Sequence, residues 1–163
     1  MGSTLTVDNI VGATTAANVK LPAGSILQVQ RAQIGGNVTT TSSTPVATGL
    51  EKAITPKFAT SLIKVQCLGG RSYVAAGQQL DISLFKDGSN VNSVGAGRWE
   101  SHYSAGDHHH GGYSAVYFET AGNTSSRTYQ VYFDVGSGTG YFTNSPSGNQ
   151  EYQVHLVITE ISV

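Results

Sequence analysis

Apolar and polar residues alternate along most of this chain in short runs. From residue 25 to residue 33 the alternation has the two-residue period of a half-buried strand. Further strand-like segments lie at 46–54, 61–68, 80–86, 91–94, 98–103, 113–120, 128–135, 140–143 and 152–161. The polar tract 39–44 is expected to be an exposed strand edge or a loop. Because long segments with a helical period are absent, the pattern predicts an all-β fold.

Turn-forming residues separate these segments. Asp87-Gly88 between two apolar runs predicts a β-hairpin, and Pro56, which cannot donate to a strand ladder, places a turn at 55–60. The glycines at 95–97, 111–112 and 136–140 lack the context of phosphate loops, so we expect tight turns with positive φ. Many short strands with such turns predict an antiparallel β-sandwich of jelly-roll character over residues 25–163.

Residues 1–24 have a different character from the rest of the chain. They mix β-prone and small residues and are too polar for a secretory signal. A short helix around 13–19 would need a partner surface to stabilise it. We expect an anchor segment whose apolar side chains contact a partner: Leu5, Val7, Ile10, Val11, Val19 and Leu21.

The composition narrows the range of partners. Only 12% of the 163 residues are charged, against roughly 25% in an average soluble domain, and the net charge is -1. Lys and Arg are scattered singly, which argues against binding to nucleic acid or to anionic membranes. The apolar runs are too short for membrane insertion. The single cysteine, Cys67, lies in an apolar run and is expected to be a buried core residue.

Two stretches of sequence resemble a known family. Ser3-Thr-Leu-Thr-Val-Asp-Asn-Ile-Val-Gly12, followed by Val19-Lys-Leu-Pro-Ala-Gly-Ser-Ile-Leu-Gln-Val-Gln30, resembles the start of tail-fibre and other virion appendage proteins of tailed bacteriophages, especially marine ones. Thr48-Gly-Leu-Glu-Lys-Ala-Ile-Thr-Pro56, Thr60-Ser-Leu-Ile-Lys-Val65 and the closing strand Leu156-Val-Ile-Thr-Glu-Ile161 are similar to further family motifs.

This resemblance implies a homotrimeric β-structured fibre or knob of a virion, assembled in the host cytoplasm. Residues 1–24 would dock to other virion proteins, and the head would bind a glycan or protein of the host surface. Long fibres carry a shaft between leader and head that this chain lacks. The resemblance therefore leaves open a short appendage, a head fibre, or a capsid decoration or tail adaptor protein that contacts only other virion proteins.

A histidine-rich segment is the most unusual local feature. On an extended backbone His108 and His110 point the same way, as imidazole metal ligands would, and Asp107 offers an oxygen. A second ligand pair is missing from the sequence, since His155 is isolated in a strand. We therefore expect a polar loop at a subunit contact or receptor face and no cofactor, with a metal ion at His108 and His110 as the alternative.

The remaining candidates are aromatic rings and carboxylates. Trp99, Tyr103 and Tyr141 lie beside the long loops 95–112 and 136–149 and are the best candidates for exposed rings that contact a receptor. Glycan hydrolysis would need two carboxyl groups close together, which the sequence alone cannot place. We assign no catalytic residues and expect a protein without enzymatic activity. The carboxylates considered are Asp81, Glu100, Asp107, Glu119 and Asp134.

Overall fold

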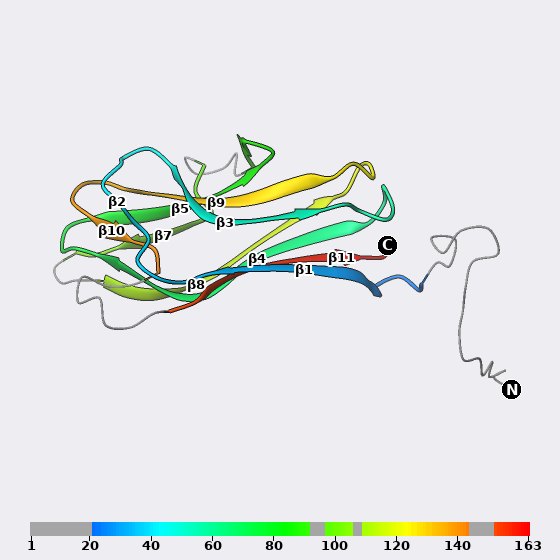
Figure 1. Ribbon diagram of the computed structural model, residues 1–163, viewed down its shortest axis with the longest axis horizontal. Coiled ribbons are helices and arrows are strands. Elements are labelled where there is room, and N and C mark those ends of the chain that lie inside the picture. Colours follow the sequence, from blue (N-terminus) through cyan, green and yellow to red (C-terminus); the bar gives the residue numbers. More distant parts are fainter. Residues whose placement is uncertain (1–20, 92–96, 106–108, 144–151) are drawn as a thin grey trace, which may run out of the picture.

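The chain folds as two packed antiparallel β-sheets (Figure 1). The computed structural model describes residues 21–91, 97–105, 109–143 and 152–163, where it consists of strands, turns and loops. The strands are β1 (Ile26–Ile34), β2 (Thr39–Thr40), β3 (Val46–Ile54), β4 (Leu62–Val74), β5 (Gln79–Lys86), β6 (Ser89–Asn90), β7 (Glu100–Tyr103), β8 (His109–Thr120), β9 (Arg127–Val135), β10 (Gly140–Tyr141) and β11 (Val154–Ile161). The predicted all-β sandwich is confirmed.

The strand order is that of a jelly roll. Sheet 1 contains β1-β11-β4-β8, with β10 and β2 continuing from β4, and sheet 2 contains β3-β9-β5-β7, with β6 also paired to β5. Among the eight main strands, the first pairs with the last (β1 with β11), then β3 with β9, β4 with β8 and β5 with β7. This nested pairing is the chain path of a rolled-up double Greek key.

The core lies between the sheets and follows from the alternation in the sequence. In β9, Tyr129, Val131, Phe133 and Val135 are buried while the residues between them are partly exposed. Ile63, Val65 and Cys67 of β4 face them from sheet 1, and Cys67 is fully buried as predicted. Each such aliphatic or aromatic side chain contributes roughly 1.5–3 kcal/mol when it leaves water.

A kink in β4 extends the sandwich beyond the predicted strand. Gly69 and Gly70 have φ of 82° and 73°, and the ladder with β8 shifts register there. At Gly70 a Cβ atom would overlap the side chain of Val154, so only glycine fits. After the kink β4 continues to Val74 and pairs with the beginning of β8.

This continuation corrects two expectations. Residues 104–112 do not form one loop, because β8 begins at His109. Gly111 and Gly112 lie in that strand rather than in a turn with positive φ, whereas Gly97 and Gly138 do have positive φ.

The Asp87-Gly88 hairpin forms as predicted. Both residues have positive φ, 50° and 80°, as a type I′ turn requires. The returning strand covers Ser89–Asn90, ahead of the expected range. In the expected strand at 91–94, Val91 is not part of a strand, and residues 92–94 lie outside the described residues.

The two ends of the sandwich differ in what they carry (Figure 1). At the terminal end, the Gly24 N–H donates to the Ser162 carbonyl (2.8 Å), and the turns after β3 and β8 lie nearby. At the opposite end, here called the loop end, lie the described parts of the connections β1–β3, β4–β5, β7–β8 and β9–β11. Within the described ranges, no helix is long and apolar enough to cross a membrane.

Candidate functional site

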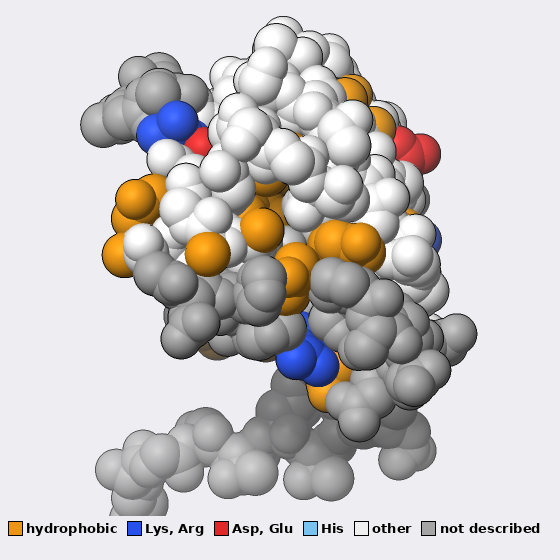
Figure 2. Space-filling model, turned by 90° about the vertical axis from the view of Figure 1, so that its left-hand side faces the viewer, with side chains coloured by type: hydrophobic (Ala, Val, Ile, Leu, Met, Phe, Trp, Pro, Cys, Tyr) orange, Lys and Arg blue, Asp and Glu red, His pale blue; other side chains and the backbone are white. Residues whose placement is uncertain are grey.

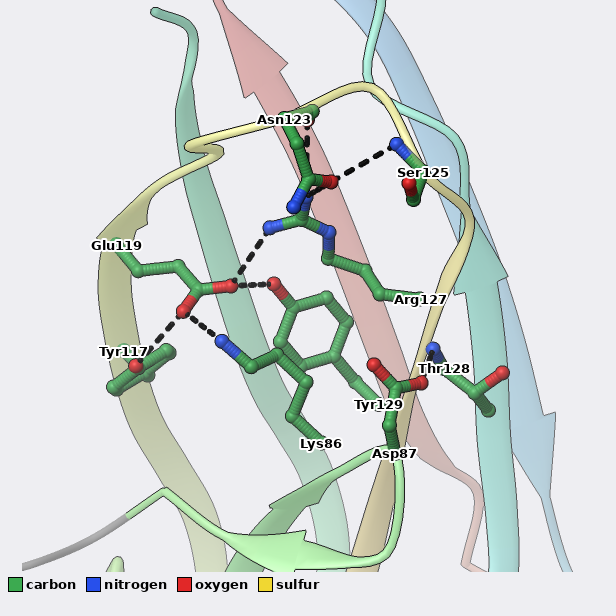
Figure 3. Close-up of polar contacts among 9 residues, drawn as sticks. All are labelled: Lys86, Asp87, Tyr117, Glu119, Asn123, Ser125, Arg127, Thr128 and Tyr129. Atoms are coloured by element: carbon green, nitrogen blue, oxygen red, sulfur yellow. Dashed lines mark hydrogen bonds and ion pairs between the residues drawn. The ribbon is translucent and has the colours of Figure 1, made fainter. Parts of the chain in front are cut away.

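A polar cluster centred on Glu119 closes the sandwich between β8 and the strands of sheet 2 (Figure 3). Lys86 Nζ lies 2.5 Å from Glu119 Oε2, and the Tyr117 hydroxyl donates to the same oxygen at 3.2 Å. Glu119 Oε1 accepts from the Tyr129 hydroxyl and lies 3.4 Å from Arg127 Nη1. One carboxylate thus collects four donors from three strands.

Strand alternation explains how this cluster forms. Tyr117 and Glu119 are two residues apart on β8, as are Arg127 and Tyr129 on β9, so each pair shares the inward face of its strand. Lys86 ends β5 directly opposite Tyr129. The cluster therefore joins the edge of sheet 1 to sheet 2.

The turn between β8 and β9 is held by the same groups. Arg127 Nη2 donates to the carbonyl oxygen of Asn123 (3.0 Å) and to its side-chain oxygen (2.9 Å). On the other side, Asp87 Oδ1 accepts the backbone N–H of Thr128 at 2.8 Å. The two turns are thus fixed beside each other.

The cluster shifts the ionisation of its members. Partial burial alone would raise the pKa of Glu119, but the hydrogen bonds from Lys86 and Tyr129 outweigh it and lower that pKa below its ordinary value. Burial and the hydrogen bond to Glu119 raise the pKa of the Tyr129 hydroxyl. At neutral pH Glu119 is therefore a carboxylate that forms ion pairs with both Lys86 and Arg127.

A pocket of about 190 Å³ lies beside this cluster, between the two turns. Its lining combines donors and acceptors with one small apolar side chain: Lys86, Asp87, Ala121, Asn123, Ser125, Ser126 and Arg127. These groups can bind a small polar molecule by hydrogen bonds. The sequence placed Glu119 only among unassigned carboxylates; its two-residue spacing from Tyr117 was the one available signal of a shared face.

A second polar cluster has the residue types of a catalytic triad. Ser72 Oγ contacts His102 Nδ1, and His102 Nε2 lies 2.9 Å from Glu100 Oε1. Ser72 is 1% exposed, however, and its hydroxyl donates to the Gly111 carbonyl at 3.0 Å. Because a substrate cannot reach a buried hydroxyl whose proton is already used, this cluster serves to join β4, β7 and β8.

The structure separates the three predicted recognition residues. Tyr103 on β7 is 61% exposed, and hydrophobic side chains gather among the loops of the loop end (Figure 2). Tyr141 is half-buried, and its ring packs edge-to-face on Tyr73 with centroids 5.4 Å apart. Trp99 is half-buried: it packs against the core, and its indole nitrogen is buried without a hydrogen-bond partner among the described residues. The backbone N–H of Trp99 donates to the carbonyl oxygen of Ile82 at 2.7 Å.

Two of the predicted carboxylates come together. Asp81 and Asp134 occupy directly opposite positions on β5 and β9. Arg98 Nε lies 2.6 Å from Asp81 Oδ2, and Gln79 donates to the other oxygen at 2.8 Å. Both oxygens of the buried Asp81 are thus bonded, whereas Asp134 is partly exposed. Asp107 lies outside the described residues.

The metal and anchor predictions fall largely outside the described part of the chain. His108 and the side chain of His110 lie outside it; the His110 backbone belongs to β8 and pairs with Tyr73. Among the described residues, groups of three or more His, Cys, Asp or Glu side chains placed to hold a metal ion are absent. Leu21 is 45% exposed. The other anchor residues, Leu5, Val7, Ile10, Val11 and Val19, also lie outside the described residues.

Comparison with known proteins adds no relative. No protein-family model matches the chain, and no curated protein matches it significantly. Function must therefore be inferred from the residues and from their geometry.

Proposed function

We propose that this chain is a structural protein of a bacteriophage virion, a short fibre or appendage whose jelly-roll head binds a receptor on the host surface. The observation that supports the proposal is the division between the two ends of the sandwich. Gly24 is tied to Ser162 at the terminal end, and the strands joined by the β1–β3, β4–β5, β7–β8 and β9–β11 connections meet these connections at the loop end. An anchor at residues 1–24 would then hold the terminal end and leave the loop end facing outward.

The loop end offers aromatic contact groups. Tyr103 is exposed, Tyr141 is half-buried against Tyr73, and the Arg71 guanidinium lies over the Tyr152 ring at 5.5 Å. Such rings stack on sugars or pack against protein side chains. Several copies on one particle would turn weak single contacts into firm adsorption. The role is therefore binding rather than catalysis.

We also propose that the head is a homotrimer. The outer face of sheet 1 exposes Val29, Val116 and Phe118, and it carries Arg31 and Lys64 in the same rows. The outer face of sheet 2 carries the acidic side chains Glu51 and Asp134. A contact between the basic face of one copy and the acidic face of the next would be heterologous, and such contacts close into rings.

The receptor proposal is tested with two exposed side chains of similar exposure. Tyr103 at the loop end is 61% exposed and Ile26 at the terminal end is 60% exposed, so neither substitution should unfold the head. We expect Tyr103→Ala to weaken binding of the labelled protein to host cells by about tenfold, as loss of an aromatic contact does, and Ile26→Ala to leave it unchanged. Equal binding by wild type and Tyr103→Ala would refute the recognition surface.

The alternative role, capsid decoration, differs from receptor binding in where the protein lies on the particle. The exposed apolar side chains on the face of sheet 1 would also fit a fixed neighbour in a capsid lattice. Imaging of labelled particles distinguishes the two roles: protruding heads at the tail or a vertex favour receptor binding, and a regular lattice of copies on the capsid favours decoration.

A further inference from the structure

The pocket between the β5–β6 and β8–β9 turns has the size and polarity of a small-ligand site. Its volume of about 190 Å³ is below the roughly 300–1,000 Å³ of sites for drug-sized molecules. A single sugar ring matches this smaller volume. We propose that this pocket is a binding site for one uncharged sugar residue.

The lining offers both kinds of hydrogen-bonding partner that a sugar hydroxyl needs. The Lys86 ammonium group has three N–H donors, and one of them donates to Glu119, which leaves two for a ligand. Asp87 is exposed, and its Oδ1 accepts the Thr128 N–H. The carboxylate can still accept further hydrogen bonds from a ligand. The hydroxyls of Ser125 and Ser126 lie on the exposed turn that lines the other side.

The charges around the pocket select a neutral ligand. Two cations, Lys86 and Arg127, are balanced by the carboxylates of Glu119 and Asp87. A phosphate would have to compete with Glu119 for both cations, and a divalent metal ion would be repelled by them. A polyhydroxylated ligand without charge faces neither penalty.

The polar groups are held in place before any ligand arrives. Arg127 is only 7% exposed and is fixed by Glu119 and by two bonds to Asn123. Figure 3 shows the guanidinium between the carboxylate and the turn. Preorganised groups lose little entropy on binding. Because the lining contains no aromatic platform among the described residues, we expect millimolar affinity, about -4 kcal/mol.

The site is separate from the receptor surface proposed above, because the β8–β9 turn lies beside the β3–β4 turn at the terminal end. The inference does not rest on a virion role, and a direct binding measurement on the purified full-length protein tests it. The probes are glucose, galactose and N-acetylglucosamine as neutral sugars and glucuronate and inorganic phosphate as anions. Saturation-transfer NMR detects the binding of each sugar, and competition with a bound sugar detects the binding of phosphate.

Two variants and one control test whether the sugar binds in this pocket. Asp87→Asn keeps a residue that tolerates positive φ and can still accept from Thr128. We expect it to weaken binding of a neutral sugar by about tenfold, the loss of one hydrogen bond to a charged group. Ser126→Tyr, which fills the pocket from an exposed turn, should abolish binding. Tyr103→Ala at the loop end should leave it unchanged.

Each other result overturns the inference. Absence of binding by all three neutral sugars would do so, as would preferred binding of phosphate or glucuronate. Sugar binding that survives Asp87→Asn and Ser126→Tyr but is lost in Tyr103→Ala would place the sugar at the loop end instead.

Discussion

Asp81 and Asp134 face each other across adjacent strands, with Arg98 paired to only one of them. Burial and the charge of Asp81 raise the pKa of Asp134, and Arg98 opposes this only in part. In the folded state Asp134 therefore keeps its proton to a higher pH than in the unfolded chain. Ionised Asp134 destabilises the fold at neutral pH; this penalty begins to shrink as pH falls to the folded-state pKa and is gone below the pKa of the unfolded state.

Removing that charge should stabilise the protein. We expect Asp134→Asn to raise the unfolding free energy at pH 7 by about 0.2–1 kcal/mol, the size of a cross-strand pair, and to have no effect below the pKa of the unfolded state. Urea denaturation at pH 7 and at acid pH measures both values. Glu51→Gln, an exposed carboxylate bonded to Gln130, is the control and should not stabilise. A less stable Asp134→Asn would refute the repulsion.

Acid should weaken the fold through Glu160. This side chain is fully buried and accepts the backbone N–H groups of Lys57 (2.7 Å) and Phe58 (3.3 Å). Burial opposes its ionisation, but the hydrogen bond from Gln28 and these backbone bonds lower its pKa. The stability that the carboxylate contributes is complete above its ordinary pKa of 4.5 and is lost as pH falls through the lower folded value.

Glu160→Gln tests this source of acid sensitivity. We expect it to lower the unfolding free energy at pH 7 by about 1–3 kcal/mol and to flatten the dependence of stability on pH below 4.5, measured by thermal unfolding across acid buffers. An unchanged slope would mean that other carboxylates carry the acid response.

Glu119 should contribute more to the free energy of unfolding than any single group that donates to it. Glu119→Gln removes the charge that balances Lys86 and Arg127, of which Arg127 is 7% exposed. We expect a loss of about 2 kcal/mol, below the roughly 3–5 kcal/mol of a fully buried pair because Lys86 is partly exposed. Tyr117→Phe removes only a 3.2 Å hydrogen bond and should cost less than about 1 kcal/mol. Equal losses in denaturant titrations would contradict the central position of Glu119.

The kink in β4 should depend on the absence of a side chain at Gly70. Gly70→Ala would combine a positive φ with an overlap on Val154, whereas Gly77→Ala has a similar φ of 74° and open space around it. The control should lose only the backbone penalty of about 1–2 kcal/mol, and Gly70→Ala should lose more. Comparable melting temperatures for the two variants would show that Val154 moves aside easily.

The proposed ring of copies predicts a pattern of rescue. Lys64→Glu and Glu51→Lys should each reduce the trimer, because each places like charges across the heterologous contact. Mixing the two variants should restore opposite charges at two of the three contacts in a mixed ring and so increase assembly, as measured by light scattering. A wild-type monomer, or a mixture no more assembled than its parts, would reject the arrangement.

The sequence predicted those features that depend on neighbours along the chain. Alternation located β3 at Val46–Ile54 with its observed bounds, and Asp87-Gly88 located the hairpin. It ended β4 at residue 68, because two glycines read as a turn when the partner strand β8, against which β4 forms the bulge, is unknown. It named Trp99 among the candidates for exposed rings, because the core residues against which this ring packs lie far from it along the chain.

The Glu119 site could not be predicted for the same reason. Its spacing from Tyr117 on β8 indicates a shared face, and so does that of Arg127 and Tyr129 on β9. The jelly-roll path of the chain determines that these strand faces pack together, since Lys86 precedes Glu119 by 33 residues. A pattern of period two cannot choose between such paths.

The pairing of β1 with β11 also constrains how the molecule is made. β1 lies at the edge of sheet 1, and its hydrogen-bonded neighbour is β11, the last strand described. Ile26 therefore cannot pair with Ile161 until β11 has been synthesised. A ribosome delivers the chain from its first residue, and closing so long a loop is slow. The nascent chain therefore carries β1 without its ladder until β11 has been synthesised. Pauses or truncations before β11 should leave this strand available for pairing with other chains.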